Sequence, residues 1–363
     1  MEEIKILEVI PTLKSGGAER LVMDLVLALN NKQKVKVEVL TLFNSKEEFY
    51  YQTIIENKVA VKSLNKKKGF DINCLINTFK IVKNSDVDII HCHLNTLKYL
   101  ALPCILYKKK LVYTIHNLAE KDAPGIYRII YKYLFKNSNI IPVAICNNVK
   151  KSAISYYGKL LNNLPIVFNG VNIKEIVNSN VIKEYKEDIS IKFLCVATFK
   201  EQKNHKYLID IFEKIALKYE NVKLFLAGEG ILKESIKNYV REKKIEDKVI
   251  FLGDRSDIYS LMNSMDVFIL TSKYEGFSIS ILEAMAARMK IIVSNVGGNG
   301  EQILDDYNGI LFDLEDPNKI LVSLDKLLEN DKYNKNAYNR VIELFDINVT
   351  AKQYLELFSN INN

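Results

Sequence analysis

Short apolar segments alternate with amphipathic segments along the first half of the chain. Residues 19–29 and 72–82 carry apolar side chains at the spacing of a helix. The apolar segments between such stretches cover residues 4–10, 35–42, 87–91, 111–115 and 143–146. Strands that alternate with helices form a parallel sheet covered on both faces, so the pattern predicts such a sheet here.

The second half repeats the alternation with a new set of apolar segments. They cover residues 192–197, 222–227, 249–252, 267–271, 290–294 and 309–312, and residues 204–219 between the first two have helical periodicity. Two successive sets predict an α/β protein with two doubly wound, Rossmann-like domains rather than one large sheet.

The boundary between these domains is predicted at Asn169-Gly170, a turn dipeptide followed by the polar segment 172–190. The predicted domains are therefore residues 1–169 and 170–346. The remaining residues, 347–363, include a helical pattern over 349–358.

Composition and charge narrow the class of protein. Of 363 residues, 48% are hydrophobic and 26% charged, which is typical of a folded globular protein. The five cysteines are scattered, the N-terminus has no signal-peptide pattern, and no apolar segment reaches the length of a membrane span. These features predict a cytoplasmic protein without a disulfide framework or a structural zinc site.

The charge is unevenly distributed. Residues 1–170 carry 25 basic and 14 acidic side chains, a balance of +11, whereas the remainder carries −4. A basic first half indicates contact with a polyanion, either nucleic acid or an anionic membrane surface. Uneven drift of a lysine-rich composition is the alternative interpretation.

Glycines mark the turn between the first strand and the first helix. Gly16 and Gly17 precede Ala18-Glu19-Arg20 and would let the backbone approach an anion at the helix start. The full G-x-G-x-x-G fingerprint is absent, so dinucleotide binding is not indicated. A simple tight turn is the alternative.

Lysines crowd the start of the helix predicted over 204–219. Lys200 and Lys203 precede Asn204, the predicted N-cap. Cations are misplaced at the positive end of a helix dipole, and a bound diphosphate would remove the penalty. Lys203 is thus a candidate diphosphate ligand, unless it is simply solvated.

Two glutamates flank the start of a helix that is apolar on nearly all sides. Such a helix is usually buried, so Glu283 needs hydrogen-bond donors, and vicinal sugar hydroxyls would serve. Glu275 follows the strand at 267–271, at the sheet edge where parallel sheets bind ligands. Two capping boxes, Ser272-x-x-Glu275 and Ser280-x-x-Glu283, are the alternative.

The histidines give a further candidate. His116 ends the strand at 111–115, and His91 and His93 end another. Because no acidic or cysteine partner stands at supporting spacing, we expect no metal site at this pair. His205 is expected on the outer turn of its helix.

Taken in order and spacing, these motifs resemble the retaining glycosyltransferases of family 4, which have the GT-B architecture of two domains facing across a cleft. The resemblance covers nearly the whole chain and is strongest over 192–301. It implies that Glu275 and the backbone of Gly276, Phe277 and Ser278 address the donor sugar, and that Glu283 holds the ribose hydroxyls. Lys203 matches the phosphate lysine of the family, but Thr198 stands where its phosphate arginine usually is.

In the first domain, the resemblance makes Gly16 and Gly17 the family's glycine loop and His116 the histidine that contacts the sugar. It also makes 347–363 the helix that crosses back to the first domain. The catalytic set implied is His116, Lys203 and Glu275, with no metal and no cofactor.

The implied function is transfer of a hexose from a nucleoside-diphosphate sugar, commonly a UDP-sugar, to a glycan or lipid-linked acceptor in cell-surface polysaccharide synthesis. The basic first domain, with the amphipathic segment 127–136, would contact an anionic membrane surface at the inner face. A nucleotide-sugar epimerase and a silent sugar-nucleotide sensor are alternatives. No nucleic-acid-binding module is recognisable, so nucleic acid is not an expected partner.

Overall fold

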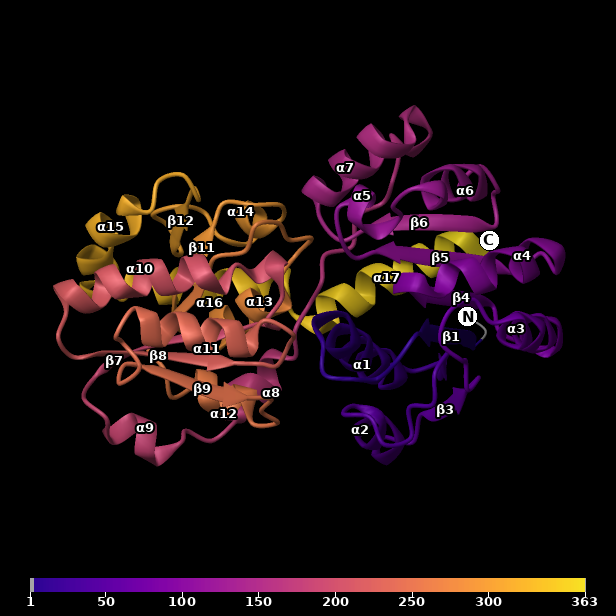
Figure 1. The fold of residues 1–363 in the computed structure, drawn as a ribbon. Helices are drawn as coiled ribbons and strands as arrows, with labels where there is room; N and C mark the ends of the chain where they lie inside the picture. Colours follow the sequence, from indigo (N-terminus) through magenta and orange to yellow (C-terminus); the bar gives the residue numbers. More distant parts are fainter. Residues whose placement is uncertain (1–2, 363) are drawn as a thin grey trace. The chain divides into compact units, whose positions relative to one another are not determined.

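A computed structural model describes residues 3–362, which form two compact units. The first unit comprises Met1–Val171 and Ile347–Asn363, and the second comprises Asn172–Asp346 (Figure 1). Each unit contains one sheet of six parallel strands with flanking helices, so the predicted fold class is confirmed.

The first sheet has the strand order β3-β2-β1-β4-β5-β6. The strands are β1 Ile4–Ile10, β2 Val35–Thr41, β3 Ala60–Ser63, β4 Ile89–His93, β5 Lys110–Ile115 and β6 Ile140–Ala144. The helices of this unit are α1 Gly17–Asn30, α2 Tyr51–Glu56, α3 Ile72–Asn84, α4 Leu97–Leu106, α5 Ala119–Asp122, α6 Ile126–Leu134, α7 Asn147–Tyr157 and α17 Ile347–Asn362. Strand β3 was not predicted, because this four-residue edge strand has no fully buried side chain.

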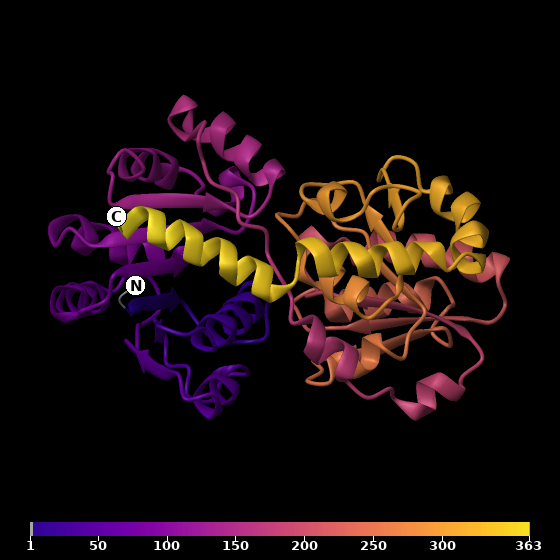
Figure 2. The same ribbon diagram turned by 180° about the vertical axis from the view of Figure 1, so that it is seen from behind.

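The second sheet has the order β12-β11-β10-β7-β8-β9. Its strands are β7 Ile191–Val196, β8 Val222–Ala227, β9 Val249–Gly253, β10 Val267–Leu270, β11 Lys290–Ser294 and β12 Ile310–Phe312. Its helices are α8 Ile173–Asn178, α9 Lys183–Glu187, α10 His205–Lys218, α11 Lys233–Glu242, α12 Ile258–Met262, α13 Ile279–Ala286, α14 Asn299–Gln302, α15 Asn318–Glu329 and α16 Lys332–Leu344. Helices α10 and α11 lie on one face of this sheet and α16 on the other (Figures 1 and 2).

Both sheets reverse their strand order once, between β1 and β4 in the first and between β7 and β10 in the second. Ligands of doubly wound sheets bind at the carboxyl ends of the two strands where the order reverses. The glycine loop, the lysine and the two glutamates follow β1, β7 and β10, so the topology places each of these motifs at a switch point.

The last helix, α17, belongs to the first unit and runs across its sheet (Figure 2). Ile347 N–H donates to the carbonyl of Val171, and Thr350 Oγ1 donates to the carbonyl of Phe168. A Cβ on Gly170 would lie only 2.4 Å from Thr350 Oγ1 and 2.9 Å from Ile347 Cα. Gly170 therefore allows the start of α17 to pack directly on the turn at the end of the first unit.

Candidate active site

Two loops meet at the switch point of the second sheet. Lys203, in the turn before α10, extends its ammonium to 2.5 Å from Glu275 Oε1 in the loop after β10. The loops are also joined through their backbones, because Lys273 N–H donates to the Gln202 carbonyl at 2.8 Å. Lys203 and Glu275, predicted separately and 72 positions apart, thus form one partly buried ion pair.

Glu275 accepts a further hydrogen bond from Ser272 Oγ at 2.5 Å. No helix begins at Ser272, and Ser280 and Glu283 both lie inside α13. The interpretation of these two pairs as capping boxes is therefore wrong. The serine hydroxyl and the ammonium instead fix the Glu275 carboxylate, which is 5% exposed.

A glycine supports the Glu275 loop from behind. Gly297 has a φ of +52°, and a Cβ added there would lie 1.8 Å from the carbonyl oxygen of Glu275. The next residue, Gly298, donates its N–H to the carbonyl of Gly276 at 3.1 Å. Gly297 and Gly298 thus support the Glu275 loop.

Gln302, which belongs to none of the predicted motifs, fixes the start of α13. Its side-chain amide accepts from the Ser278 N–H at 3.2 Å and donates to the Ser278 carbonyl at 2.7 Å. The Ser278 N–H, predicted to address the donor, therefore has a protein partner. Phe277 is buried and packs edge-on against Phe345, with ring centroids 5.4 Å apart.

Glu283 lies within α13 and is 8% exposed. Its Oε1 accepts a hydrogen bond from the hydroxyl of Tyr259 at 3.2 Å. The prediction that this buried carboxylate requires hydrogen-bond donors agrees with this contact. Tyr259 supplies one of these donors.

Thr198 is half-buried in the loop after β7, and Lys200 is exposed. Two glycines of the loop after β8 lie against this segment. A Cβ on Gly228 would lie 2.3 Å from the Ala197 carbonyl oxygen, and a Cβ on Gly230 would lie 2.6 Å from the Phe199 carbonyl oxygen. Gly228 and Gly230 have φ values of +134° and +157°. The sequence did not indicate that both glycines have positive φ or that they lie against the loop after β7.

The start of α10 differs from the sequence prediction in two ways. Asn204 occupies the N-cap position, but in a left-handed conformation and without a side-chain capping bond. His205 is 3% exposed and stacks on Phe199 with centroids 4.2 Å apart, so its predicted place on an outer turn is wrong. Burial lowers the pKa of His205 to about 4. The neutral ring is part of the core and packs on Phe199.

In the first unit, Gly16 is the N-cap of α1 and Gly17 its first residue. Gly16 is extended, with a φ of −177°, and a Cβ there would meet only the flexible Glu19 carboxylate, at 2.4 Å from Oε2. Neither the backbone conformation nor the packing of this unit therefore requires glycine at position 16.

His116 follows β5 and is half-buried. Its Nε2 lies 2.9 Å from Nδ1 of His93, whose Nε2 lies 2.9 Å from Glu8 Oε2. Burial lowers the pKa of His116 well below its usual value, and nearby His93 and His91 act in the same direction. His116 is thus a neutral imidazole at the carboxyl edge of the first sheet, next to the strand β4 that borders the switch point.

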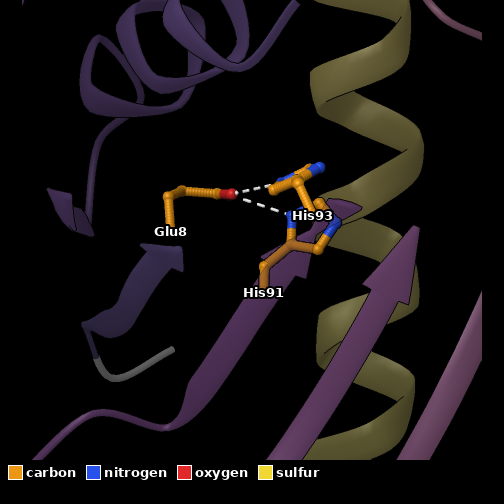
Figure 3. Close-up of side chains that lie close together, drawn as sticks. All are labelled: Glu8, His91 and His93. Atoms are coloured by element: carbon orange, nitrogen blue, oxygen red, sulfur yellow. Dashed lines mark hydrogen bonds and ion pairs between the residues drawn. The ribbon is translucent and has the colours of Figure 1, made fainter. Parts of the chain in front are cut away.

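The Glu8, His91 and His93 side chains are fully buried and lie together (Figure 3). The expectation that His91 and His93 have no acidic partner is wrong, because Glu8 on the adjacent strand accepts from both rings. One potential ligand atom from each residue lies within 4.8 Å of the others. The same atoms form the hydrogen bonds of the cluster, which give each oxygen of the Glu8 carboxylate one histidine partner.

Comparisons with known proteins identify the family to which this chain belongs. Residues 15–175 match the model described as Glycosyltransferase Family 4, and residues 178–343 match Glycosyl transferases group 1. An uncharacterized glycosyltransferase of Methanocaldococcus jannaschii is 31% identical over 340 residues, which are 88% of this chain and 87% of that protein. The chain is a family 4 glycosyltransferase.

Other relatives of this glycosyltransferase have named reactions. The UDP-Gal:alpha-D-GlcNAc-diphosphoundecaprenol alpha-1,3-galactosyltransferase of Escherichia coli is 26% identical, over 84% of this chain and 82% of that protein. A Campylobacter jejuni N-acetylgalactosaminyltransferase, named for a diphospho-undecaprenol substrate, is 24% identical over 91% of each chain. Among solved structures, Anabaena HepE in complex with UDP and glucose has a TM-score of 0.82 at 19% identity, over 98% of this chain and 99% of that one.

The glycosyltransferase fold includes no helix, within residues 3–362, that combines the length and apolar character needed to span a bilayer.

Proposed function

We propose that this glycosyltransferase transfers a hexose from a UDP-sugar to a lipid-linked glycan, with retention of the anomeric configuration and without a metal ion. The Lys203–Glu275 ion pair at the switch point of the second sheet carries this proposal. The relatives named for UDP-galactose and for diphospho-undecaprenol substrates support the donor and the acceptor.

The main chemical demand is the negative charge that develops on the departing nucleoside diphosphate. An ammonium has three N–H donors, so Lys203 can keep its bond to Glu275 and offer two others to phosphate oxygens. Preorganised donors of this kind stabilise developing charge without reorganisation during the reaction. Lys203 would thus take the role that a divalent cation has in metal-dependent transferases.

The remaining site residues would bind and orient the donor. Glu275 and the adjacent backbone of Gly276 and Phe277 would address the sugar, and Glu283 would accept the ribose hydroxyls. Thr198 would contact phosphate more weakly than an arginine, because a hydroxyl carries no charge. No residue is assigned as a covalent nucleophile, and attack from the face of the leaving group, with the phosphate accepting the acceptor's proton, would retain the configuration.

A panel of nucleotide sugars tests the donor assignment. We expect UDP-sugars to raise the Tm, because a ligand at 100 times its Kd adds about 2.7 kcal/mol to the free energy of unfolding. GDP- and ADP-sugars serve as controls, and turnover with a lipid-linked acceptor should persist in EDTA. Loss of turnover in the chelator would contradict the metal-free proposal, and conversion of the donor without any acceptor would favour the epimerase alternative.

The acceptor would be presented at a membrane by helix α6 of the first unit. Within α6 only Tyr131 is buried, whereas Ile126, Ile129 and Tyr133 are 63%, 61% and 73% exposed. Tyr131 packs on Tyr113 in the core of its own domain, whereas these three side chains stay largely exposed. Arg128, Lys132 and Lys136 add positive charge to the same helix and its end.

Neighbouring α4 extends this surface, because the Lys98 ammonium lies 5.7 Å from the Tyr127 ring centroid. Leu102 and Leu106 of α4 are 57% and 61% exposed. An exposed apolar helix with flanking cations has the composition of a segment that lies in a membrane interface. Lys109 is not part of this surface, since its ammonium donates to the Ser85 and Val87 carbonyls.

The double variant Ile129→Ser, Tyr133→Ser should bind anionic vesicles at least tenfold more weakly than the parent chain, since a buried apolar side chain contributes about 1.5–3 kcal/mol. Cosedimentation at low salt measures the binding. Leu217→Ser and Val322→Ser replace apolar residues of the second unit that are 84% and 79% exposed, and these control variants should bind as the parent does. Equal recovery of the parent with neutral and anionic vesicles would argue against membrane docking.

A further inference from the structure

A chain of hydrogen bonds leads from His116 to a buried carboxylate. Glu8 and His91 are direct partners in the pairing of β1 with β4, and His93, two residues further along β4, points to the same face. Glu8 Oε1 lies 3.0 Å from His91 Nδ1, Glu8 Oε2 lies 2.9 Å from His93 Nε2, and His93 Nδ1 lies 2.9 Å from His116 Nε2 (Figure 3 shows the first three residues).

The charge of Glu8 sets the direction of every bond in this chain. Burial raises the pKa of Glu8, but attraction and hydrogen bonds from His91 and His93 outweigh it and lower the pKa to about 2. An ionised carboxylate only accepts hydrogen bonds, so His93 Nε2 must carry the hydrogen. Burial lowers the pKa of His93 to about 4, so this ring is neutral and its Nδ1 is an acceptor.

The same logic assigns the proton of His116. Because His93 Nδ1 is an acceptor, the bond between the two rings requires that His116 Nε2 donates its hydrogen. The opposite tautomer would set two lone pairs against each other at 2.9 Å. In the neutral His116 ring, Nδ1 is then left without a hydrogen and can accept one from a ligand.

We propose that Glu8, acting through His93, is a positioning residue that holds His116 as its Nε2–H tautomer, so that Nδ1 accepts a hydrogen bond from a hydroxyl of the donor sugar. The assignment of the tautomer stands on the geometry of the first unit alone. The assignment of the sugar hydroxyl rests on the proposed function.

A second branch holds the carboxylate in place. His91 Nε2 lies 2.8 Å from Thr114 Oγ1, which lies 2.8 Å from the hydroxyl of Tyr354 on α17. This branch reaches Glu8 without passing through His93 or His116. Thr114 therefore offers a control position, equally buried and in the same cluster, whose loss leaves the His93 branch intact.

Nitrogen-15 NMR of the histidine rings tests the tautomer in the full-length protein. The sequence holds only four histidines, and a tautomer is identified by which ring nitrogen bears the hydrogen. We expect a hydrogen on Nε2 of both His93 and His116 in the parent protein. A hydrogen on Nδ1 of His116, or a His93 Nε2 that lacks one because it binds a metal ion, would overturn the proposal.

The Glu8→Gln variant probes the control exerted by the carboxylate. A glutamine amide has one oxygen that accepts and one nitrogen that donates, so it must donate to either His91 or His93. In the molecules where it donates to His93, the hydrogens of His93 and His116 should both move to Nδ1. Thr114→Val should leave His116 as the Nε2–H tautomer. If His116 stays exclusively Nε2–H in Glu8→Gln while His91 still carries its hydrogen on Nδ1, the proposal is overturned. The parent spectrum decides it if this variant does not fold.

Kinetic measurements test whether the His116 tautomer affects the proposed reaction. We expect Glu8→Gln to lower kcat/KM about 2- to 12-fold, the range for one neutral hydrogen bond. In a His116→Asn background, where the amide can present its oxygen whatever the state of His93, Glu8→Gln should cause no further loss. An altered tautomer with unchanged kcat/KM would refute the contact with the sugar but not the relay, whereas equal losses in both backgrounds would refute action through His116.

Discussion

Gly297→Ala is expected to lower kcat/KM about 100-fold, because a displacement of about 1 Å in a positioning group can cost that much. Alanine at a φ of +52° is strained by about 1–2 kcal/mol, and its Cβ would lie 1.8 Å from the Glu275 carbonyl oxygen. The atom that must yield is backbone, so the loop that carries Glu275 has to move. Its ion pair with Lys203 would move with it.

Steady-state kinetics and thermal unfolding of the same variant measure this effect. Gly300→Ala is the matched control, because its Cβ would meet Asn295 and Leu311 at the ordinary distances of 3.4 and 3.6 Å. We expect that control to stay within about twofold of the parent, as surface and helical substitutions without strain usually do. Parental kinetics in Gly297→Ala would show that the position of the Glu275 loop does not limit the reaction.

Lys203→Ala is expected to reduce kcat/KM by roughly 10- to 150-fold, which corresponds to the loss of one charge-assisted hydrogen bond of about 1.5–3 kcal/mol. If the ammonium acts mainly on the departing diphosphate, the loss should fall on kcat as well as on kcat/KM, because the charge develops only as the bond breaks. The variant also leaves the buried Glu275 carboxylate with Ser272 but without its cation.

The double variant Lys203→Met, Glu275→Gln separates these two effects. It restores much of any stability lost in Lys203→Ala, because neither half of the ion pair remains, but it should not restore turnover. Lys273→Ala is the control. Lys273 lies in the same loop as Glu275, but its side chain is 43% exposed and pairs with Glu201. A Lys203→Ala enzyme with parental kcat and KM would remove Lys203 from the reaction.

The periodicity of the sequence was sufficient to predict both sheets. Strands buried on both faces appear as continuous apolar segments, and 11 of the 12 strands within residues 3–362 overlap such segments, although β6 does so over only two residues. Strand β3 was missed because an exposed edge strand has no such signal. The buried Glu283 was also predictable, because a helix that is apolar on nearly all sides leaves a carboxylate no route to solvent.

Local apolar periodicity and chain order are enough to predict the fold and the sheet edge at which each motif lies. The contacts between side chains could be seen only in the folded protein: Glu8 with His91 and His93, Lys203 with Glu275, and Gln302 with Ser278. These contacts depend on the register between strands and on the course of loops far apart in the chain. Gly297 is the clearest case, because a glycine has no side chain to signal its function, and only its neighbour Glu275 shows why no Cβ fits there.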